Sequence, residues 1–434
     1  MKIIFVFISI MGVLMSSVLP KYYEQTQENG LKVIAIPMNE GSNVITTDVF
    51  YQVGSGDEIM GKSGIAHMLE HLNFKSTKNL KAGEFDKIVK GFGGVNNAST
   101  GFDYTHYYIK SSSSNMDKSL ELFAELMSNL NLKDDEFQSE RDVVAEERRW
   151  RTDNSPIGYL YFKLFNLAYE YHSYHWTPIG FMGDIQTWTI EDIREFHKKF
   201  YQPSNAIVMV AGDINKDEVF KSTQKYFGKI NNSVEIKRNH TKEIPQNEEK
   251  RSVIYKSSEV EMVAVAYKIP EFNHKDQIAL SMLGELLSSG KSSILNRVLI
   301  DEKKLLSKIY AYPMDTKSAG VFMLLGVCNT GVEAKDAEIE ILKILDSIKS
   351  AKFDEKELEK IKINVKLDFI HSIQSSSGVV NLYGEYFAKG DVSVILDYED
   401  DIKKITKKDI VDVAKKYLKA NKSTTIILKN DLSK

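Results

Sequence analysis

The sequence of 434 residues has one cysteine, eight prolines and little net charge, and these scarcities exclude several classes of protein. A lone thiol, Cys328, cannot form a disulfide within the chain, and the apolar residues before it predict a buried side chain rather than a nucleophile. The net charge of −3, without a basic patch or a long run of one sign, excludes a nucleic-acid-binding surface. The composition, 42% hydrophobic and 27% charged, is typical of a soluble globular protein with about two or three domains.

Long hydrophobic runs are absent except at the N-terminus. Lys2 is followed by an apolar run over residues 3–18 and then by polar sequence. This run is shorter than the roughly 20 apolar residues of a membrane-spanning helix, and its basic start is typical of a secretory signal. We therefore expect residues 1–20 to be a signal peptide, with a retained membrane anchor as the alternative. Either assignment predicts a periplasmic or secreted protein, anchored to the membrane only if the segment is retained.

Histidine is also scarce, yet two of the nine histidines lie four residues apart in His67-Met68-Leu69-Glu70-His71. On an α-helix, residues three and four apart share a face, so His67, Glu70 and His71 would point the same way. Two imidazoles so placed can bind one Zn²⁺, with the carboxylate beside a water molecule on the metal. The order H-x-x-E-H is the inverse of the commoner H-E-x-x-H zinc motif. The alternative is a pair of surface histidines next to an acidic residue.

A catalytic zinc usually has three protein ligands, so a second helix would have to supply one more. Residues 134–151 form a charged helical pattern in which Glu140 and Glu147 are two turns apart and face the same side. Val143 and Val144 lie between them and predict that this side is buried. Burying two carboxylates is costly unless a cation compensates them, as a zinc ion would. The alternative is a solvated, charged surface helix.

The chain contains an internal repeat of a helix followed by a strand, at a constant offset of 217 residues. The matching groups are Asp184 with Asp401, Thr189 with Thr406, Asp192 with Asp409, Lys198 and Lys199 with Lys415 and Lys416, and the strand 207–210 with 424–427. The fixed offset indicates two homologous halves of similar size rather than a chance likeness between two amphipathic helices.

Each half mixes β-branched strand patterns with amphipathic helical ones. This predicts an α+β fold of two homologous α/β sandwich halves, each a sheet with helices packed on one face. We place the halves at residues 30–235 and 251–430, with residues 236–250 as a linker because that segment is polar and carries Pro245. The histidine pair lies in the first half alone, so we expect a metal site there and none in the second half.

Further motifs of the first half agree with one family. Besides the H-x-x-E-H stretch and Glu140-Arg141 with Glu147, they are Phe74-Lys75-Ser76-Thr77, Gly93-Gly94, Asn97-Ala98-Ser99-Thr100, Asp103-Tyr104-Thr105, Pro178-Ile179-Gly180 and Phe200-Tyr201-Gln202-Pro203. Through these residues the chain resembles the pitrilysin- or insulinase-type zinc metallopeptidases, which include insulin-degrading enzyme. Its length is similar to that of a short bacterial subfamily that resembles the mitochondrial processing peptidase beta subunit.

The resemblance implies a set of metal ligands and catalytic residues. His67, His71 and Glu147 would hold one Zn²⁺ per chain. Glu70 would be the general base, and Glu140 would support the site from behind by orienting a ligating histidine. The function implied is the hydrolysis of peptides or unfolded polypeptides by a zinc-dependent endopeptidase.

The resemblance also implies where a peptide binds. Asn97, Ala98, Ser99 and Thr100 would form the edge of a sheet, to which a substrate adds a strand through backbone hydrogen bonds. Without the resemblance, a polar turn leading into the next strand is the better interpretation of these four residues.

The second half departs from the family pattern at two positions. Self-sufficient members carry an arginine after a serine pair and a tyrosine thirteen residues later, which help to hold the substrate and its oxyanion. Here Ile294 and Ser307 occupy those positions, and Arg297 and Tyr310 keep the spacing only after a three-residue shift. The departure implies a dimer in which another chain supplies the pair. A heterodimer with a homologous non-catalytic subunit is favoured over a homodimer.

Two other functions stay open. A non-catalytic core or partner subunit of a larger complex would share the fold, although such subunits commonly lose the metal ligands that this chain keeps. A dedicated protease that processes a single precursor would have the same catalytic residues as a general peptidase.

Overall fold

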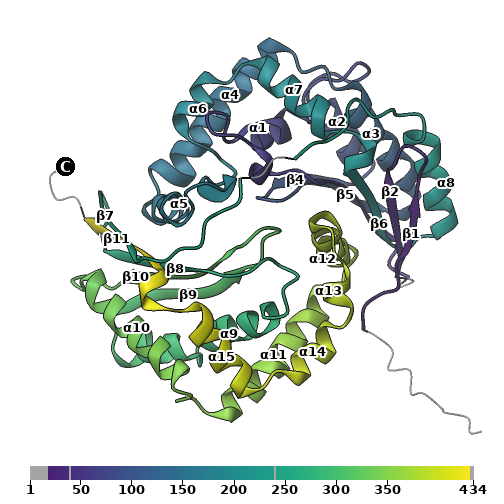
Figure 1. The fold of residues 1–434 in the computed structure, drawn as a ribbon. Helices are drawn as coiled ribbons and strands as arrows, with labels where there is room; N and C mark the ends of the chain where they lie inside the picture. The colour runs from purple at the N-terminus through teal and green to yellow at the C-terminus, as the bar shows by residue number, and fades with distance from the viewer. Residues whose placement is uncertain (1–17, 39–40, 239–240, 431–434) are drawn as a thin grey trace, which may run out of the picture.

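A computed structural model of the protein describes residues 18–38, 41–238 and 241–430. These residues form two α/β halves whose sheets face each other, with most of the helices on the outside (Figure 1). The fold class expected from the sequence is thereby confirmed. Most of the expected signal peptide lies outside the described residues. Within the described ranges, no helix combines the length and apolarity needed to cross a bilayer.

The first half contains a mixed six-stranded sheet in the order β1-β2-β6-β3-β5-β4. Its strands are β1 (Tyr23–Thr26), β2 (Lys32–Pro37), β3 (Val44–Tyr51), β4 (Val95–Thr100), β5 (Thr105–Ser112) and β6 (Ala206–Gly212). Its helices are α1 (Ile65–Leu72), α2 (Glu84–Gly91), α3 (Met116–Asn129), α4 (Asp134–Arg148), α5 (Pro156–Ala168), α6 (Met182–Thr187), α7 (Ile190–Phe200) and α8 (Lys216–Phe227). Strands β2 and β6 run parallel and the other pairs antiparallel, with β4 at one edge.

The second half contains a five-stranded sheet in the order β7-β11-β8-β10-β9. Its strands are β7 (Lys250–Lys256), β8 (Met262–Lys268), β9 (Leu306–Met314), β10 (Val321–Cys328) and β11 (Ser423–Asn430). Its helices are α9 (Gln277–Ser288), α10 (Ala334–Lys349), α11 (Glu355–Ser372), α12 (Ser376–Lys389), α13 (Ser393–Leu396), α14 (Tyr398–Lys404) and α15 (Lys407–Tyr417). If β1 is set aside, this strand order repeats that of the first sheet, with the parallel pair β7–β11 in the place of β2–β6.

Short helical segments complete the chain. The 3₁₀ turns are η1 (Ser55–Asp57), η2 (Ser113–Asn115), η4 (Ser173–His175), η5 (Pro203–Asn205) and η7 (Ala420–Lys422), and the π-helical segments are η3 (Arg149–Asp153) and η6 (Asn296–Glu302). The segment η3 continues α4 directly, so the chain stays helical beyond Arg148 but with a wider turn.

The internal repeat corresponds to equivalent elements of the two halves. Helix α7 begins with a capping box in which the hydroxyl of Thr189 accepts from the backbone N–H of Asp192 at 3.3 Å. Helix α15 begins in the same way with Thr406 and Asp409, also at 3.3 Å. The repeated residues therefore fix the start of the same helix in each half.

Each half covers the inner sheet face of the other with one helix, α5 or α12 (Figure 1). Leu160 and Leu164 of α5 pack against the second sheet, whereas Tyr383 of α12 packs against the first. The contact of α12 is so close that a Cβ atom on Gly384 would lie 2.1 Å from Cζ of Phe50. This exchange of helices joins the two halves through two apolar cores.

Candidate metal centre

Helix α1 carries both histidines of the H-x-x-E-H stretch and is held on the first sheet by its apolar side. Its buried residues are Ile65, Ala66, Met68, Leu69 and Leu72. The remaining side presents His67, Glu70 and His71, as the helical spacing predicted. The packing of the apolar side therefore fixes the direction of the three polar side chains.

The N-terminus of α1 is capped from outside the helix. Gly64 is the N-cap, with φ of 88°, and the carboxylate of Glu58 accepts from the N–H groups of Gly64 and Ala66 at 2.8 Å each. Ser63, the residue before Gly64, has another partner, since its Oγ donates to Asp184 Oδ2 at 2.6 Å. A buried carboxylate thus takes the usual place of a capping hydroxyl one turn before His67.

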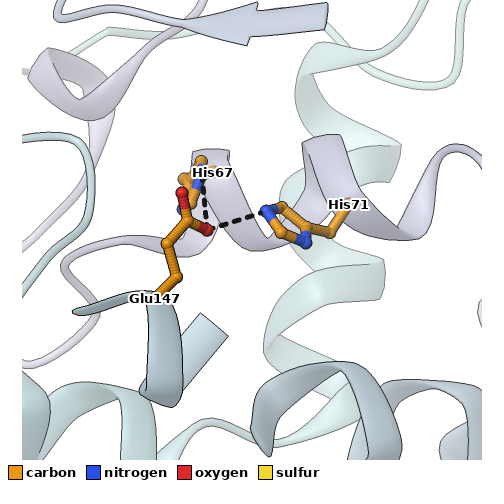
Figure 2. Close-up of side chains that lie close together, drawn as sticks. All are labelled: His67, His71 and Glu147. Atoms are coloured by element: carbon orange, nitrogen blue, oxygen red, sulfur yellow. Dashed lines mark ion pairs between the residues drawn. The ribbon is translucent and has the colours of Figure 1, made fainter. Parts of the chain in front are cut away.

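Helix α4 packs beside α1 and brings Glu147 to the histidine pair, as Figure 2 shows. Oε2 of Glu147 lies 3.3 Å from Nε2 of His71 and 3.7 Å from Nε2 of His67. One ligand atom from each of the three residues lies within 4.8 Å of the others. Elsewhere in the described ranges, no other three side chains of ligating type come this close. The structure therefore brings together the three residues that the resemblance implies as metal ligands.

This arrangement fits a zinc ion. Ligand atoms around a tetrahedral zinc, with bonds of roughly 2.0–2.1 Å, lie about 3.4 Å apart. The distances of 3.3 and 3.7 Å are close to that value. Two imidazole nitrogens and one carboxylate oxygen are also the donor set of a catalytic zinc whose fourth position is open to water. His67, His71 and Glu147 would hold the ion.

The histidines differ in their electrostatic surroundings. Burial lowers the pKa of His67 to about 4, so its imidazole is neutral, which is the form that binds metals. Burial also lowers the pKa of His71, but hydrogen bonds to Glu140 and Glu147 outweigh this effect and raise it to about 9. The space beside His71 therefore favours a positive charge.

Glu140 lies behind His71, where its Oε1 is 2.8 Å from Nδ1 of the imidazole. The ammonium group of Lys75 pairs with the other oxygen of Glu140. Burial raises the pKa of Glu140, but the hydrogen bonds from His71 and Lys75 outweigh it and hold the pKa below its ordinary value. An ionised Glu140 thus holds the ring of His71 with Nε2 towards Glu147.

Glu70 is held by a residue of the neighbouring strand. Oγ1 of Thr100 donates to Oε2 of Glu70 at 2.5 Å, which links the end of β4 to α1. Burial raises the pKa of Glu70, and the hydrogen bond from Thr100 opposes this effect. A raised pKa makes the carboxylate of Glu70 a better proton acceptor than an exposed glutamate.

Residues 97–100 lie in a strand rather than in a turn. In β4, Asn97 pairs with Tyr108 and Ser99 with His106 of β5, and the described residues place no strand on the other side of β4. Asn97 and Ser99 are exposed. The backbone of β4 is therefore an open sheet edge whose C-terminal end, at Thr100, lies next to Glu70.

One expectation about α4 is wrong. Val143 is 49% exposed, whereas Val144 is buried. The buried stripe of α4 runs through Glu140 and Val144, with Glu147 at its border and Val143 about 40° further round the helix. Glu146 is 72% exposed, as its helical phase predicts. Glu147, the expected third ligand, thus lies at the boundary between the core and solvent.

The second-half positions discussed above lie on separate elements. Ile294 is buried, and Ser307 is exposed on β9. Arg297, in η6, makes an ion pair of 3.5 Å with Glu357 of α11, whereas Tyr310 is 46% exposed on β9. The guanidinium of Arg297 is therefore already engaged within the second half.

Three residues of the site were missed in the sequence. Lys75 follows His71 by one helical turn, and Arg151 follows Glu147 by one turn and binds its Oε1. Both could have been found from their spacing of four residues. Glu58 gives no such signal, because its contacts with α1 depend on how the preceding loop folds back.

Two segments of the sequence match the models of two domains of one peptidase family. Residues 33–162 match "Insulinase (Peptidase family M16)", and residues 187–365 match "Peptidase M16 inactive domain". The zinc protease PqqE of Helicobacter pylori is 52% identical over 416 residues, which are 95% of this chain and 94% of that protein. The probable mitochondrial-processing peptidase subunit beta of Arabidopsis thaliana is 27% identical over 330 residues, 71% of this chain and 60% of that protein.

The structure agrees with these matches. The crystal structure of a protease from Helicobacter pylori superposes on this chain with a TM-score of 0.93 at 52% identity, covering 95% of this chain and all (100%) of that one. Sequence similarity of this extent, together with the same two-halved fold, settles the family. The chain belongs to peptidase family M16.

Proposed function

We propose that the protein is a zinc-dependent endopeptidase that hydrolyses peptides or unfolded polypeptides. The observation that carries this proposal is the convergence of His67, His71 and Glu147 within 4.8 Å, with Glu70 on the same side of α1 as the histidines. The similarity to a relative named as a zinc protease supports the same reaction class.

The side chains around the three ligands have separate roles in this proposal. A bound zinc would act as a Lewis acid that polarises the scissile carbonyl and acidifies a water molecule. Glu70 accepts a proton from the attacking water on its carboxylate and delivers it to the leaving amine. Thr100 orients that carboxylate through the 2.5 Å hydrogen bond to Oε2, and Glu140 orients His71.

The substrate would bind as an additional strand on β4. The open backbone of Asn97, Ala98, Ser99 and Thr100 can form the hydrogen bonds of a sheet ladder with any extended peptide. Such a ladder selects little by side chain, which suits the hydrolysis of varied, unfolded segments. It also positions the peptide backbone beside Glu70.

The protein would act as a dimer. The absence of the family's arginine and tyrosine at Ile294 and Ser307 supports a heterodimer with a homologous non-catalytic chain over a homodimer. The Arabidopsis relative is itself named as a subunit of a peptidase. In this arrangement the partner supplies the missing substrate contacts.

We further propose that residues 1–20 direct the protein to the periplasm or the exterior. The support is the basic residue and apolar run at the start of the sequence. If the protein is exported, its substrates would be peptides outside the cytoplasm. Processing of one dedicated precursor is the narrower version of the same reaction and uses the same residues.

The test is cleavage of a quenched fluorescent peptide by the purified protein, with and without a chelator and added zinc. Glu70→Gln should reduce kcat by about 100- to 10,000-fold while the zinc content stays the same. Glu146→Gln, which removes a neighbouring exposed carboxylate, is the matched control and should keep full activity. Unchanged cleavage by Glu70→Gln would refute the proposed role, and cleavage by the chain alone at the full rate would refute the heterodimer.

A further inference from the structure

An arginine that the proposed reaction does not use lies in direct contact with the third metal ligand. Nε of Arg151 is 2.9 Å from Oε1 of Glu147. The other oxygen, Oε2, is the one that faces His67 and His71. The guanidinium therefore holds the oxygen of Glu147 that points away from the metal position.

The backbone of Arg151 is fixed by close packing. It belongs to the π-helical segment η3, whose hydrogen bond from Asn154 N to Arg149 O measures 2.7 Å. A Cβ atom on Gly158 of α5 would lie 2.0 Å from the carbonyl oxygen of Arg151, so that only glycine permits this approach. A guanidinium anchored at both its backbone and its Nε has little freedom left to lose on binding a ligand.

The rest of the guanidinium is open to solvent. The side chain of Arg151 is 62% exposed, although its Nε is bonded to Glu147. By contrast, the ammonium group of Lys75 is paired with Glu140. An arginine presents its remaining N–H groups as a planar fork that matches a carboxylate. The remaining N–H groups of Arg151 are thus held in place and available to bind an anion beside the metal centre.

Two apolar side chains close to Arg151 in the sequence are exposed. Trp150 is 73% exposed and precedes Arg151 in η3, and Val143 is 49% exposed one turn before Glu147. An exposed tryptophan next to an anchored arginine combines two residue types that are enriched in binding hot spots. The surface is therefore suited to a peptide side chain rather than to water alone.

We propose that Arg151 is a substrate-recognition residue that binds a carboxylate of the peptide next to the scissile bond. The inference rests on the proposed peptidase function and names the substrate class of that site. The carboxylate belongs either to an aspartate or glutamate side chain or to the free C-terminus. Several carboxylates lie around the site, among them Glu70, Glu140 and Glu147, and the exposed guanidinium of Arg151 adds a positive charge that attracts an acidic peptide.

The test compares peptides of identical length in which one glutamate is moved through the positions on either side of the cleavage site. Each is paired with its glutamine counterpart, and one pair differs in having a free or an amidated C-terminus. We expect kcat/KM for the best glutamate or free-carboxylate peptide to exceed that of its neutral counterpart about tenfold, through KM. Arg151→Gln should abolish this preference, and Arg151→Lys should restore part of it.

Arg149→Gln is the matched control. Arg149 lies in the same turn and pairs with Glu146, which is not a ligand, so this variant should keep the preference. Zinc content is measured for every variant. If Arg151→Gln keeps the preference, or slows both peptides of a pair equally while losing zinc, the proposal is wrong, because Arg151 then only supports Glu147.

A binding measurement separates this inference from the proposed function. Affinities of the same peptides for Glu70→Gln, with and without Arg151→Gln, are measured by fluorescence anisotropy. A tenfold preference that depends on Arg151 supports the inference even if no variant cleaves the peptides. Equal affinities for acidic and neutral peptides would overturn it even if the protein is an active peptidase.

Discussion

The two halves place a pair of packed helices in equivalent positions, but the chemistry of the two pairs is opposite. In the first half, α1 and α4 meet through His71, Glu140 and Glu147. In the second half, α9 and α11 are in contact and contribute aliphatic side chains to one apolar cluster. These buried residues are Leu280, Leu283, Leu286, Leu287, Leu358, Ile361 and Val365. The fold therefore tolerates either a polar or an apolar contact at this position.

In this duplicated fold, one helix pair carries the candidate metal ligands, and the equivalent pair serves only to stabilise its half. An apolar helix pair stabilises its half through burial. A contact with two partly buried carboxylates around a histidine is costly unless a cation compensates them. Because α9 and α11 show that an apolar solution exists, the polar pair is best explained by the ion that it would bind.

The largest expected effect is the loss of the third ligand. Glu147→Gln should weaken zinc binding by about 1,000-fold or more, since even partners that only orient a ligand change affinity by roughly 10- to 100-fold. Competition with a chromophoric chelator measures the affinity. Glu146→Gln is the control and should bind like the wild type. Equal affinities for the two variants would remove Glu147 from the ligand set.

A mutation in the apolar pair of helices, α9 and α11, should change the stability of the protein but not its zinc affinity. Leu283 is fully buried in α9, so Leu283→Ala should lower the free energy of unfolding by roughly 2–5 kcal/mol. Urea denaturation measures this change. The zinc affinity of the folded variant should match the wild type, and a large change in affinity would contradict the division between the halves.

Glu140 should have an intermediate effect. It touches His71 at 2.8 Å but is not a ligand, so Glu140→Gln should lower the zinc affinity by about 10- to 100-fold. The absorption spectrum of the cobalt-substituted protein should shift as well, because the ring of His71 loses its ionised partner. A spectrum and affinity identical to the wild type would show that Glu140 does not orient the histidine.

A smaller effect is expected at a buried cation of the second half. Nζ of Lys268 lies 3.0 Å from the centre of the Tyr169 ring and 3.7 Å from Oε1 of Glu243, and burial lowers its pKa to about 7. The unfolded chain, with an ordinary lysine pKa near about 10.4, binds this proton more tightly. Stability should therefore rise as the pH increases from about 7 to 10.

The comparison variant for this effect is Lys268→Met, which has no proton to lose. Between pH 7 and 9 the wild type should gain about 1 kcal/mol per pH unit relative to the variant in urea denaturation. If the stability of the two proteins changes with pH in the same way, burial does not lower the pKa of Lys268.

Local periodicity explains which parts of the site could be predicted from the sequence. The shared direction of His67 and His71 follows from helical geometry, and so does that of Glu140 and Glu147. Val143 was predicted to be buried but is exposed, because periodicity does not show how much of the surface of α4 its neighbours cover. The bond from Thr100 to Glu70 joins residues 30 positions apart, and only the folded sheet brings them together.

The repeat predicted the two-halved fold because capping boxes are local signals that survive in both copies. The exchange of α5 and α12 between the sheets could not be predicted in this way. Both helices are apolar enough to pack on any sheet face, and the sequence does not say which half each one covers.

The most direct test of the asymmetry is the position of zinc in crystals of the protein grown with the metal. An anomalous difference map at the zinc edge should contain one strong peak per chain, at about 2.0–2.1 Å from Nε2 of His67, Nε2 of His71 and Oε2 of Glu147. No peak should appear between α9 and α11. A peak in the second half, or none at the histidines at saturating zinc, would contradict the account.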